Sequence, residues 1–204
     1  MQKTKDNIRH LLVQVAKEAF CTKGYTGVSM REIAKQSGVG LSNIYNYFNS
    51  KDELYEAVLE PLIFSLKKKM DEHNNEKHLT LQVFHSKEFQ HQTVTEMVAL
   101  AANFRLELRL LFFKSHGSPF ENYKQQLIEQ QWKMGQAYIT AMKERFHHLN
   151  CEISPLFLQI ATRWWISLLE QVALIDMLNT TNLERLISEY VCFSTAGWQA
   201  LMKA

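Results

Sequence analysis

Apolar residues recur at intervals of three and four along most of this chain, which is the spacing that places them on one face of a helix. No segment alternates between apolar and polar residues over a useful length, so the pattern predicts an all-α fold. The first helix is expected to end near Lys23-Gly24, because a positive charge followed by glycine is typical of a helix C-terminus. Its apolar stripe consists of Ile8, Leu11, Leu12, Val15, Ala16, Ala19 and Phe20.

Residues 29–48 predict two short helices joined by a tight turn. Ser29 and Glu32 have the spacing of a capping box, in which each side chain binds the backbone N–H of the other residue. Gly38-Val39-Gly40 should end the first helix, because glycine adopts backbone angles that other residues avoid. A second helix is expected to begin at about Leu41. Together they form a helix-turn-helix pattern.

The second of these helices has a distinctive polar face. Ile44 and Phe48, four residues apart, mark its buried side. The other side has hydroxyls, amides and aromatic rings and no acid: Ser42, Asn43, Tyr45, Asn46 and Tyr47. Asparagine can pair with adenine edges, serine can donate or accept, and an aromatic ring can contact a thymine methyl group. This chemistry suits a helix that enters a DNA groove, and an ordinary helical hairpin is the alternative interpretation.

Longer helices are predicted in the remainder of the chain. Ser50 and Glu53 form a second capping box and should start a helix that ends near residues 67–69. Pro61 lies inside it, where it removes one backbone hydrogen bond and is expected to produce a kink. Residues 94–113 are apolar nearly all round, so their helix should be central. Further helix starts are expected at Ser118-Pro119-Phe120-Glu121, at Ser154-Pro155, and at Thr181 with Glu184.

The composition is that of a soluble globular protein large enough to bury a core. Hydrophobic residues make up 46% and charged residues 22% of the 204 residues, which are ordinary values. The formal net charge is +2, yet residues 1–51 hold eight Lys or Arg and only three Asp or Glu. A basic N-terminal end on an acidic remainder favours a partner that presents phosphate groups.

The protein is expected to be cytoplasmic and to have no membrane partner. No apolar run approaches the length of a bilayer span. The N-terminus lacks the uninterrupted apolar segment and the small-residue cleavage site of a signal peptide. Cys21, Cys151 and Cys192 are odd in number and widely spaced, so we interpret them as reduced, buried thiols.

A specific set of short motifs occurs between residues 28 and 59: Ser29 with Arg31-Glu32-Ile33-Ala34, Gly38-Val39, Ile44-Tyr45, Tyr47-Phe48, and Ser50-Lys51 with Leu54. In these motifs, the first sixty residues resemble the DNA-binding domain of TetR-type bacterial transcriptional regulators. The chain departs from that pattern at Gly40-Leu41, where the family more often has a capping residue followed by a polar or basic one.

The resemblance implies a helix-turn-helix DNA-binding domain in residues 1–50 and a helical ligand-binding and dimerisation domain in residues 51–204. It implies a transcriptional repressor that binds a palindromic operator as a homodimer and is released by a small, largely apolar ligand. The implied contacts with base edges come from Ser42, Asn43, Tyr45 and Asn46. The implied phosphate contacts come from Ser29, Arg31, Tyr47 and Lys51, with Lys3 or Lys5 from a basic N-terminal arm, and Gly40 and Leu41 complete the surface.

The last two helices are expected to form a dimer seam. Trp164 and Trp165 are adjacent, so they point about 100° apart on a helix and cannot both face one core. The family resemblance implies that these two helices pair with those of a second chain as a four-helix bundle. A monomer with a large core is the alternative.

The central part of the chain is rich in aromatic residues and methionine. Such side chains can line a mostly apolar cavity for a small inducer, although at helical spacing they also suit an ordinary core. The family resemblance is the main reason to expect a cavity. The candidate ligand-binding residues are Phe104, Phe112, Phe113, Trp132, Met134, Tyr138, Met142 and Trp165.

No enzyme class is indicated, and no cofactor is expected. The sequence lacks the GxSxG, P-loop, GxGxxG and HExxH motifs. His147, His148 and Cys151 are close together, but a polar helix end explains them more simply than a metal site does. The alternative to a DNA-binding regulator is a helical small-molecule-binding or adaptor protein without operator binding. Affinity for random duplex DNA at low salt distinguishes the two.

Overall fold

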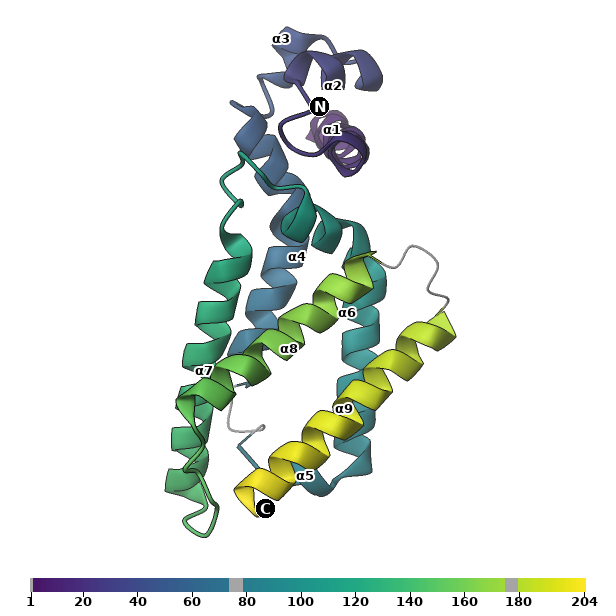
Figure 1. Ribbon diagram of the computed structural model, residues 1–204. Coiled ribbons are helices and arrows are strands. Elements are labelled where there is room, and N and C mark those ends of the chain that lie inside the picture. The colour runs from purple at the N-terminus through teal and green to yellow at the C-terminus, as the bar shows by residue number, and fades with distance from the viewer. Residues whose placement is uncertain (1, 74–78, 175–179) are drawn as a thin grey trace. The chain divides into compact units, whose positions relative to one another are not determined.

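The computed structural model describes residues 2–73, 79–174 and 180–204 of the chain. All regular structure within these residues is helical, which confirms the predicted all-α fold (Figure 1). The helices are α1 (Gln2–Lys23), α2 (Met30–Ser37), α3 (Leu41–Ile44), α4 (Lys51–His73), α5 (Gln82–His85), α6 (Lys87–Phe113), α7 (Tyr123–Arg145), α8 (Pro155–Leu174) and α9 (Thr180–Met202).

The chain folds into two compact units. Unit 1 consists of Met1–Phe64 and Leu106–Lys124, and unit 2 consists of Ser65–Arg105 and Gln125–Ala204. The domain boundary expected between residues 50 and 51 therefore falls inside unit 1. The first half of α4 belongs to unit 1 because its apolar stripe is buried there.

Unit 1 contains the helix-turn-helix and packs around aromatic rings. The Tyr55 ring of α4 makes edge contacts with Phe20 of α1, at a centroid separation of 4.8 Å, and with Tyr25, at 5.0 Å. Leu12 of α1 and Ile33 of α2 are fully buried. Aromatic pairs of this kind contribute about 0.5–1.5 kcal/mol beyond their buried area. The start of α4 thus completes the core that α1 and α2 begin.

Residues 106–124 belong to unit 1 through polar contacts as well as packing. The backbone N–H of Tyr25 donates to the carbonyl oxygen of Lys114 over 2.9 Å. The Tyr55 hydroxyl lies 2.9 Å from Ser115 Oγ. Burial raises the pKa of Tyr55 to about 12, so this hydroxyl remains neutral and can both donate and accept.

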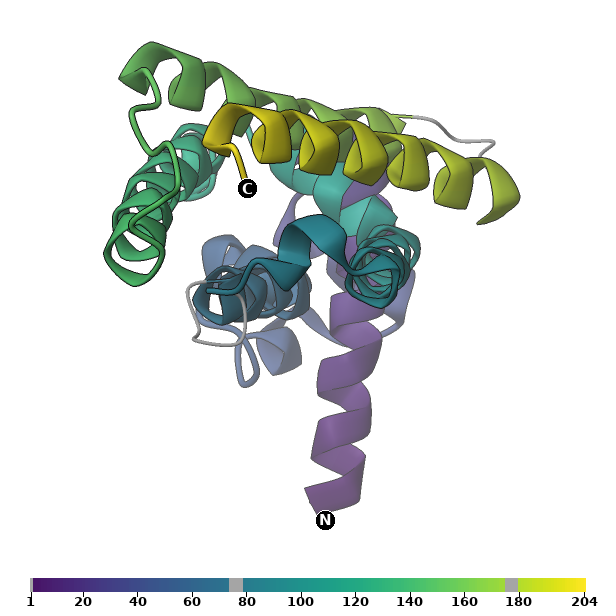
Figure 2. The same cartoon turned by 90° about the horizontal axis from the view of Figure 1, so that it is seen from below.

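The described part of unit 2 contains the long helices α6, α7, α8 and α9 together with the end of α4 and the short α5. Helices α8 and α9 run antiparallel and side by side in both views (Figures 1 and 2). Gly135 of α7 faces α8 closely, because a Cβ at this position would lie 3.3 Å from Leu158. Helix α5 contacts α9, where Gln199 Nε2 lies 3.2 Å from His85 Nδ1. A core cluster consists of Phe84, Met142, Leu149 and Met202.

Two helices begin earlier than predicted. Helix α1 begins at Gln2, so the basic arm expected around Lys3 and Lys5 is part of the helix, and the side chain of Lys3 lies outside the described residues. No glycine or proline interrupts this helix, which allows it to extend. Helix α9 begins at Thr180, so Thr181 lies inside it and is not its cap.

Helix α7 begins at Tyr123 and not at Pro119, as the sequence predicted. The predicted cap is present, because Ser118 Oγ accepts the backbone N–H two residues further on over 3.0 Å. The Glu121 carboxylate, however, reaches back to the N–H of Gly117 over 3.3 Å, and Gly117 has a positive φ of 76°. These bonds stabilise a turn, and the helix starts after it.

Helix α6 is interrupted at Phe104, whose φ of −122° and ψ of 17° are not helical. The sequence does not indicate this break, since neither glycine nor proline is nearby. Helix α4, in which Pro61 was expected to produce a kink, remains helical across that residue. The break in α6 lies next to the point where the chain passes from unit 2 to unit 1.

Candidate nucleic-acid interface and ligand cavity

The first helix of the helix-turn-helix, α2, forms one of the two hydrogen bonds of the predicted capping box. Ser29 Oγ accepts the backbone N–H of Glu32 over 3.2 Å. The Glu32 carboxylate does not return the bond and instead binds Lys23 and Gln36. Gly38 ends α2 in the left-handed conformation, with φ of 69°. The tight turn therefore has the chemistry that the sequence indicated, with half of the capping box.

Helix α3 presents the predicted polar face to solvent. Its helical hydrogen bonding continues beyond Ile44, because Phe48 N donates to the Ile44 carbonyl over 3.0 Å, and both of these side chains are buried. Asn43 is exposed, and Tyr45 is 47% exposed. Asn46 Nδ2 donates to Asn43 Oδ1 over 3.2 Å, which orients the two amides together.

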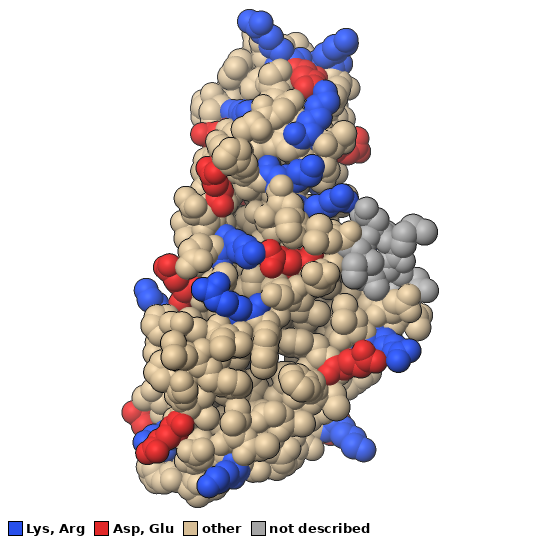
Figure 3. Space-filling model, in the orientation of Figure 1, with Lys and Arg blue, Asp and Glu red and all other residues tan. Residues whose placement is uncertain are grey.

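The other predicted DNA-binding residues surround this face. Ser29, Arg31, Gly40 and Ser42 are exposed, and Leu41 and Tyr47 are half-buried. The Arg9 guanidinium of α1 lies over the Phe48 ring, 5.1 Å from its centroid. Figure 3 shows lysine and arginine side chains over the α1–α3 part of unit 1, with fewer acidic ones among them. The exposed surface thus combines base-reading groups with positive charge.

Lys51 has a structural role that the sequence did not predict. Its Nζ donates to the carbonyl oxygens of Tyr25, over 3.0 Å, and Val28, over 3.1 Å. The same Nζ lies 3.9 Å from the centroid of the Tyr25 ring. The Tyr25 hydroxyl donates to Asp52, and burial together with this carboxylate raises the pKa of Tyr25. Lys51 therefore holds the α1–α2 loop to the start of α4, which leaves one N–H for a phosphate.

We expect Lys51→Ala to lower the free energy of unfolding by about 1–3 kcal/mol, because two backbone carbonyls lose their donor. Urea denaturation followed by circular dichroism measures this change. Lys35→Ala is the matched control, because Lys35 is exposed on α2 and makes no such contact. A Lys51→Ala variant as stable as the parent would show that these bonds are not formed in solution.

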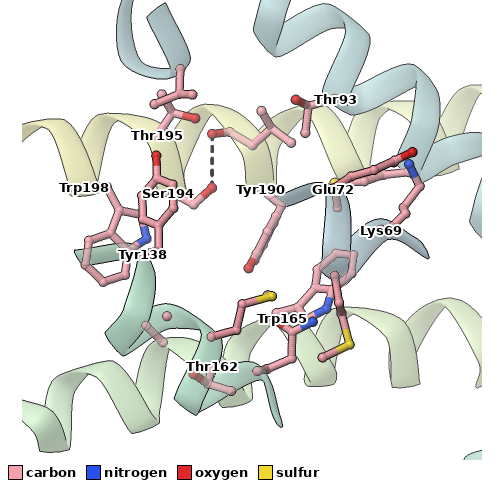
Figure 4. A pocket seen from close by; sticks show the side chains of 18 of the residues that line it. Lys69, Glu72, Thr93, Tyr138, Thr162, Trp165, Tyr190, Ser194, Thr195 and Trp198 are labelled. Carbon is pink, nitrogen blue, oxygen red and sulfur yellow. Dashed lines mark hydrogen bonds between the residues drawn. The ribbon is translucent and has the colours of Figure 1, made fainter. Parts of the chain in front are cut away.

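Unit 2 contains a cavity of about 640 Å³. Every described helix with residues in this unit, from α4 to α9, contributes to its lining. Three of the predicted ligand-binding residues line it: Met134, Tyr138 and Trp165. Figure 4 shows the labelled aromatic side chains at separate places around it, with Trp198 and Tyr138 on one side and Trp165 on the other.

The other five predicted residues do not line this cavity. Phe112 and Phe113 belong to unit 1 and contact each other, with ring centroids 6.3 Å apart. Met142 is buried in the core cluster of unit 2. Phe104 lies at the break in α6, and Trp132 is half-buried on α7. Helical spacing identified these side chains as apolar but could not tell which face of a helix meets the cavity.

The polar residues that line the cavity were not predicted from the sequence. Lys69 Nζ on α4 lies 2.6 Å from Glu96 Oε2 on α6, and Gln92 Nε2 donates to Glu96 Oε1 over 3.0 Å. Tyr190 on α9 lies in the wall near Trp165, at a centroid separation of 6.3 Å. Burial raises the pKa of both Tyr138 and Tyr190 to about 12, so both are neutral. No motif joins these residues, because they come from different helices.

The described residues offer no group of three or more His, Cys, Asp or Glu side chains placed to hold a metal ion. His147 and His148 are exposed. Cys21 and Cys151 are half-buried and Cys192 is exposed, so none of the three thiols is fully buried as expected. None of the described helices combines the length and apolarity needed to cross a bilayer.

Residues 12–58 match the profile of the TetR family of bacterial regulatory proteins. These residues form a TetR-type DNA-binding domain. The match extends from α1 into α4 and includes the whole helix-turn-helix. It confirms the family that the motifs of residues 28–59 suggested, and it identifies unit 1 as the part with the family's DNA-binding domain.

Two relatives match this N-terminal part of the chain. The uncharacterized HTH-type transcriptional regulator YhgD of Bacillus subtilis (strain 168) is 33% identical over 64 residues, which are 31% of this chain and 34% of YhgD. The HTH-type transcriptional activator FasR of Mycolicibacterium smegmatis is 43% identical over 56 residues, 28% of this chain and 26% of FasR. The matched part thus spans about a third or less of either relative.

The likeness over the rest of the chain is one of fold. NalD, described as the secondary repressor of the MexAB-OprM multidrug efflux pump in Pseudomonas aeruginosa, superimposes with a TM-score of 0.59. The comparison covers 94% of this chain and 96% of NalD at 16% sequence identity. At that identity the likeness shows the fold alone.

Proposed function

We propose that this TetR-family protein is a homodimeric transcriptional repressor that binds a palindromic operator and is released by a small, largely apolar ligand. The main support is the exposed amide-and-hydroxyl face of α3, which lies within the family-matched residues. Asn43 and Tyr45 are exposed to solvent, whereas Ile44 of the same helix is buried in the core. Such a face has little use in a protein that only binds small molecules.

The proposed contacts divide into those that read sequence and those that position the protein. Base edges are contacted by Ser42, Asn43, Tyr45 and Asn46. Phosphates are contacted by Ser29, Arg31 and Tyr47, and by the remaining N–H of Lys51. Lys5, exposed on α1, adds positive charge at the edge of this surface.

An exposed apolar surface on α8 and α9 supports the homodimer. Leu156, Ile160 and Trp164 follow one another at four-residue spacing on α8 and are 71%, 49% and 45% exposed. Phe193 on α9 is 67% exposed, and its ring centroid lies 6.2 Å from that of Trp164. Figure 3 shows few charges over these helices. A contiguous apolar surface of this kind is typical of a protein interface.

The cavity supports control by a ligand. It is lined by residues of unit 2 alone, so a bound molecule contacts a different unit from the one with the α3 face. Release from DNA then requires that the ligand bind the DNA-free arrangement more tightly than the DNA-bound one.

Selection from a random DNA library tests the operator directly. Bound fragments should share an inverted repeat whose half-sites are about one helical turn apart, roughly 34–36 Å, because a two-fold dimer presents two copies of α3. Binding should weaken steeply as salt increases. No affinity for any duplex at low salt would contradict the proposal and favour a ligand-binding or adaptor protein.

The sign of regulation needs its own measurement. Transcription in vitro from a promoter that overlaps the selected operator should decrease when the protein is added. An increase would contradict the repressor assignment and would match the activator role named for FasR.

We expect Asn43→Ala to remove about 1–3 kcal/mol of discrimination at one base pair of the operator, because an amide that pairs with a base edge is lost. The measurement compares affinities for the operator and for single-base variants at fixed salt. Asn103→Ala, on the exposed surface of α6, is the control. Equal discrimination by parent and Asn43→Ala would remove this residue from the base-reading set.

A further inference from the structure

The charged side chains of the described cavity wall include more carboxylates than cations. They are Lys69, Glu72 and Glu96. Lys69 is paired with Glu96 over 2.6 Å, so its charge is already neutralised. Among the described residues, the Glu72 carboxylate is paired with Lys68 at 3.8 Å, which is long for an ion pair. An anion entering this cavity would have to compete for Lys69 and would face Glu72, whereas a cation would meet a carboxylate whose ion pair is long.

Three hydroxyls of the wall donate their proton to backbone carbonyls of their own helices. Thr93 donates to the Phe89 carbonyl over 2.9 Å, and Thr162 donates to its own helix over the same distance. Ser194 donates to the Val191 carbonyl, as the dashed line in Figure 4 shows. A hydroxyl has one proton, so each of these groups offers only lone pairs to a ligand. An anion needs donors, so these hydroxyls do not suit it.

Two aromatic rings form a corner in the same wall. Trp165 and Tyr190 lie with centroids 6.3 Å apart and planes inclined by 42°. The Tyr190 hydroxyl has no hydrogen-bond partner among the described residues. Indole and phenol faces attract cations through their quadrupoles, and pairs of such faces recognise quaternary ammonium groups. In Figure 4, Lys69, Glu72 and Trp165 lie on the side away from Trp198 and Tyr138.

The rest of the wall suits an apolar body. Leu66, Met97, Leu100 and Met134 line the cavity from α4, α6 and α7. Methionine side chains are flexible and polarisable, so they adapt to ligands of different shape. The volume of about 640 Å³ lies within the range of small-molecule sites.

We propose that the cavity binds an amphipathic monocation, whose charged head lies near the Trp165–Tyr190 corner and the carboxylates and whose apolar body contacts the methionine-rich wall. This inference rests on the proposed function only in taking the cavity as the inducer site. It assigns the charge of the ligand, which neither the family nor the relatives indicate.

Three probes of equal chain length test the assignment: decyltrimethylammonium, decanoate and 1-decanol, each below its aggregation or solubility limit. Isothermal titration with the full-length, DNA-free protein measures their affinities. We expect the cation to bind at least about tenfold more tightly than decanoate, with the alcohol between them or close to the anion. Equal or tighter binding of decanoate, equal binding of 1-decanol and the cation, or no binding of any probe would overturn the proposal.

Two substitutions locate the charge. Glu72→Gln removes the loosely paired carboxylate, and Trp165→Leu removes one face of the aromatic corner. Each should lower the affinity for decyltrimethylammonium by about tenfold and change the affinity for 1-decanol by less than about twofold. Glu129→Gln, exposed on α7 and outside the cavity wall, is the control. Melting by circular dichroism confirms that each variant is folded, and cation affinity unchanged in both folded variants would overturn the assignment.

Operator binding separates this inference from the proposed function. If the protein binds its operator but prefers decanoate, only the assignment of a positive charge to the ligand would be overturned. If the protein binds decyltrimethylammonium through Glu72 and Trp165 but has no affinity for duplex DNA, the proposed cation site would stand and the proposed regulatory function would be wrong.

Discussion

Trp164→Glu should convert the proposed homodimer into a monomer and reduce its operator affinity by at least about 100-fold. Burying an unpaired carboxylate in an interface costs about 3–5 kcal/mol, and each 1.4 kcal/mol corresponds to a factor of ten. Trp164 is 45% exposed in the isolated chain and joins the apolar stripe of α8 to Phe193 of α9. Sedimentation velocity gives the oligomeric state, and a titration with operator DNA gives the affinity.

A control variant separates the loss of the interface from the effect of one added negative charge. Gln130→Glu adds the same charge at an exposed position of α7, outside the proposed seam, and should leave the dimer intact. Phe193→Glu should reproduce the effect of Trp164→Glu. If both seam variants remain dimers with parental operator affinity, the subunits associate through another surface and the proposed use of α8 and α9 is wrong.

Lys17→Met should lower the free energy of unfolding of unit 1 by about 3–5 kcal/mol, because it leaves the Glu107 carboxylate buried and unpaired. Lys17 on α1 donates to Glu107 Oε1 on α6, and the Glu107 side chain is only 8% exposed. Its second oxygen, Oε2, is buried without a hydrogen-bond partner in the described residues. The carboxylate therefore depends on this one ammonium group.

A double variant distinguishes the loss of a pair from the loss of packing. Lys17→Met with Glu107→Leu removes both charges and should recover most of the stability, because an apolar pair of similar volume can replace a buried ion pair. All four tryptophans lie in unit 2, so tryptophan fluorescence follows that unit while circular dichroism follows both. Equal destabilisation by the single and double variants would contradict the role of the ion pair.

The helix-turn-helix was predicted closely because its signals are local. Capping side chains, turn glycines and apolar spacing act within a few residues, so Ser29, Gly38 and Ile44 have the positions that the sequence indicated. The prediction that α7 begins at Pro119 was wrong, although the predicted Ser118 cap forms. There, Glu121 binds back to Gly117 and closes a turn before the helix begins. Local bonds alone do not decide between a turn and a first helical turn.

The cavity could be predicted only in part. Apolar spacing identifies a buried face, and it correctly separated Trp164 from Trp165, of which one is exposed and the other lines the cavity. It could not place Phe112 and Phe113, because α6 passes from one unit to the other near its break at Phe104. The two phenylalanines therefore belong to a different unit from the cavity.

By itself, the sequence determined the all-helical fold, the family of the N-terminal DNA-binding domain, and the polar face of α3, because each depends on residues close together in the chain. Only the tertiary structure decided that Lys51 binds the carbonyls of the α1–α2 loop and that Lys69 pairs with Glu96 across two helices. It also decided that Tyr190 meets Trp165 in the cavity wall. Such contacts join residues distant in sequence, and their partners are set by how whole helices pack and not by any local preference.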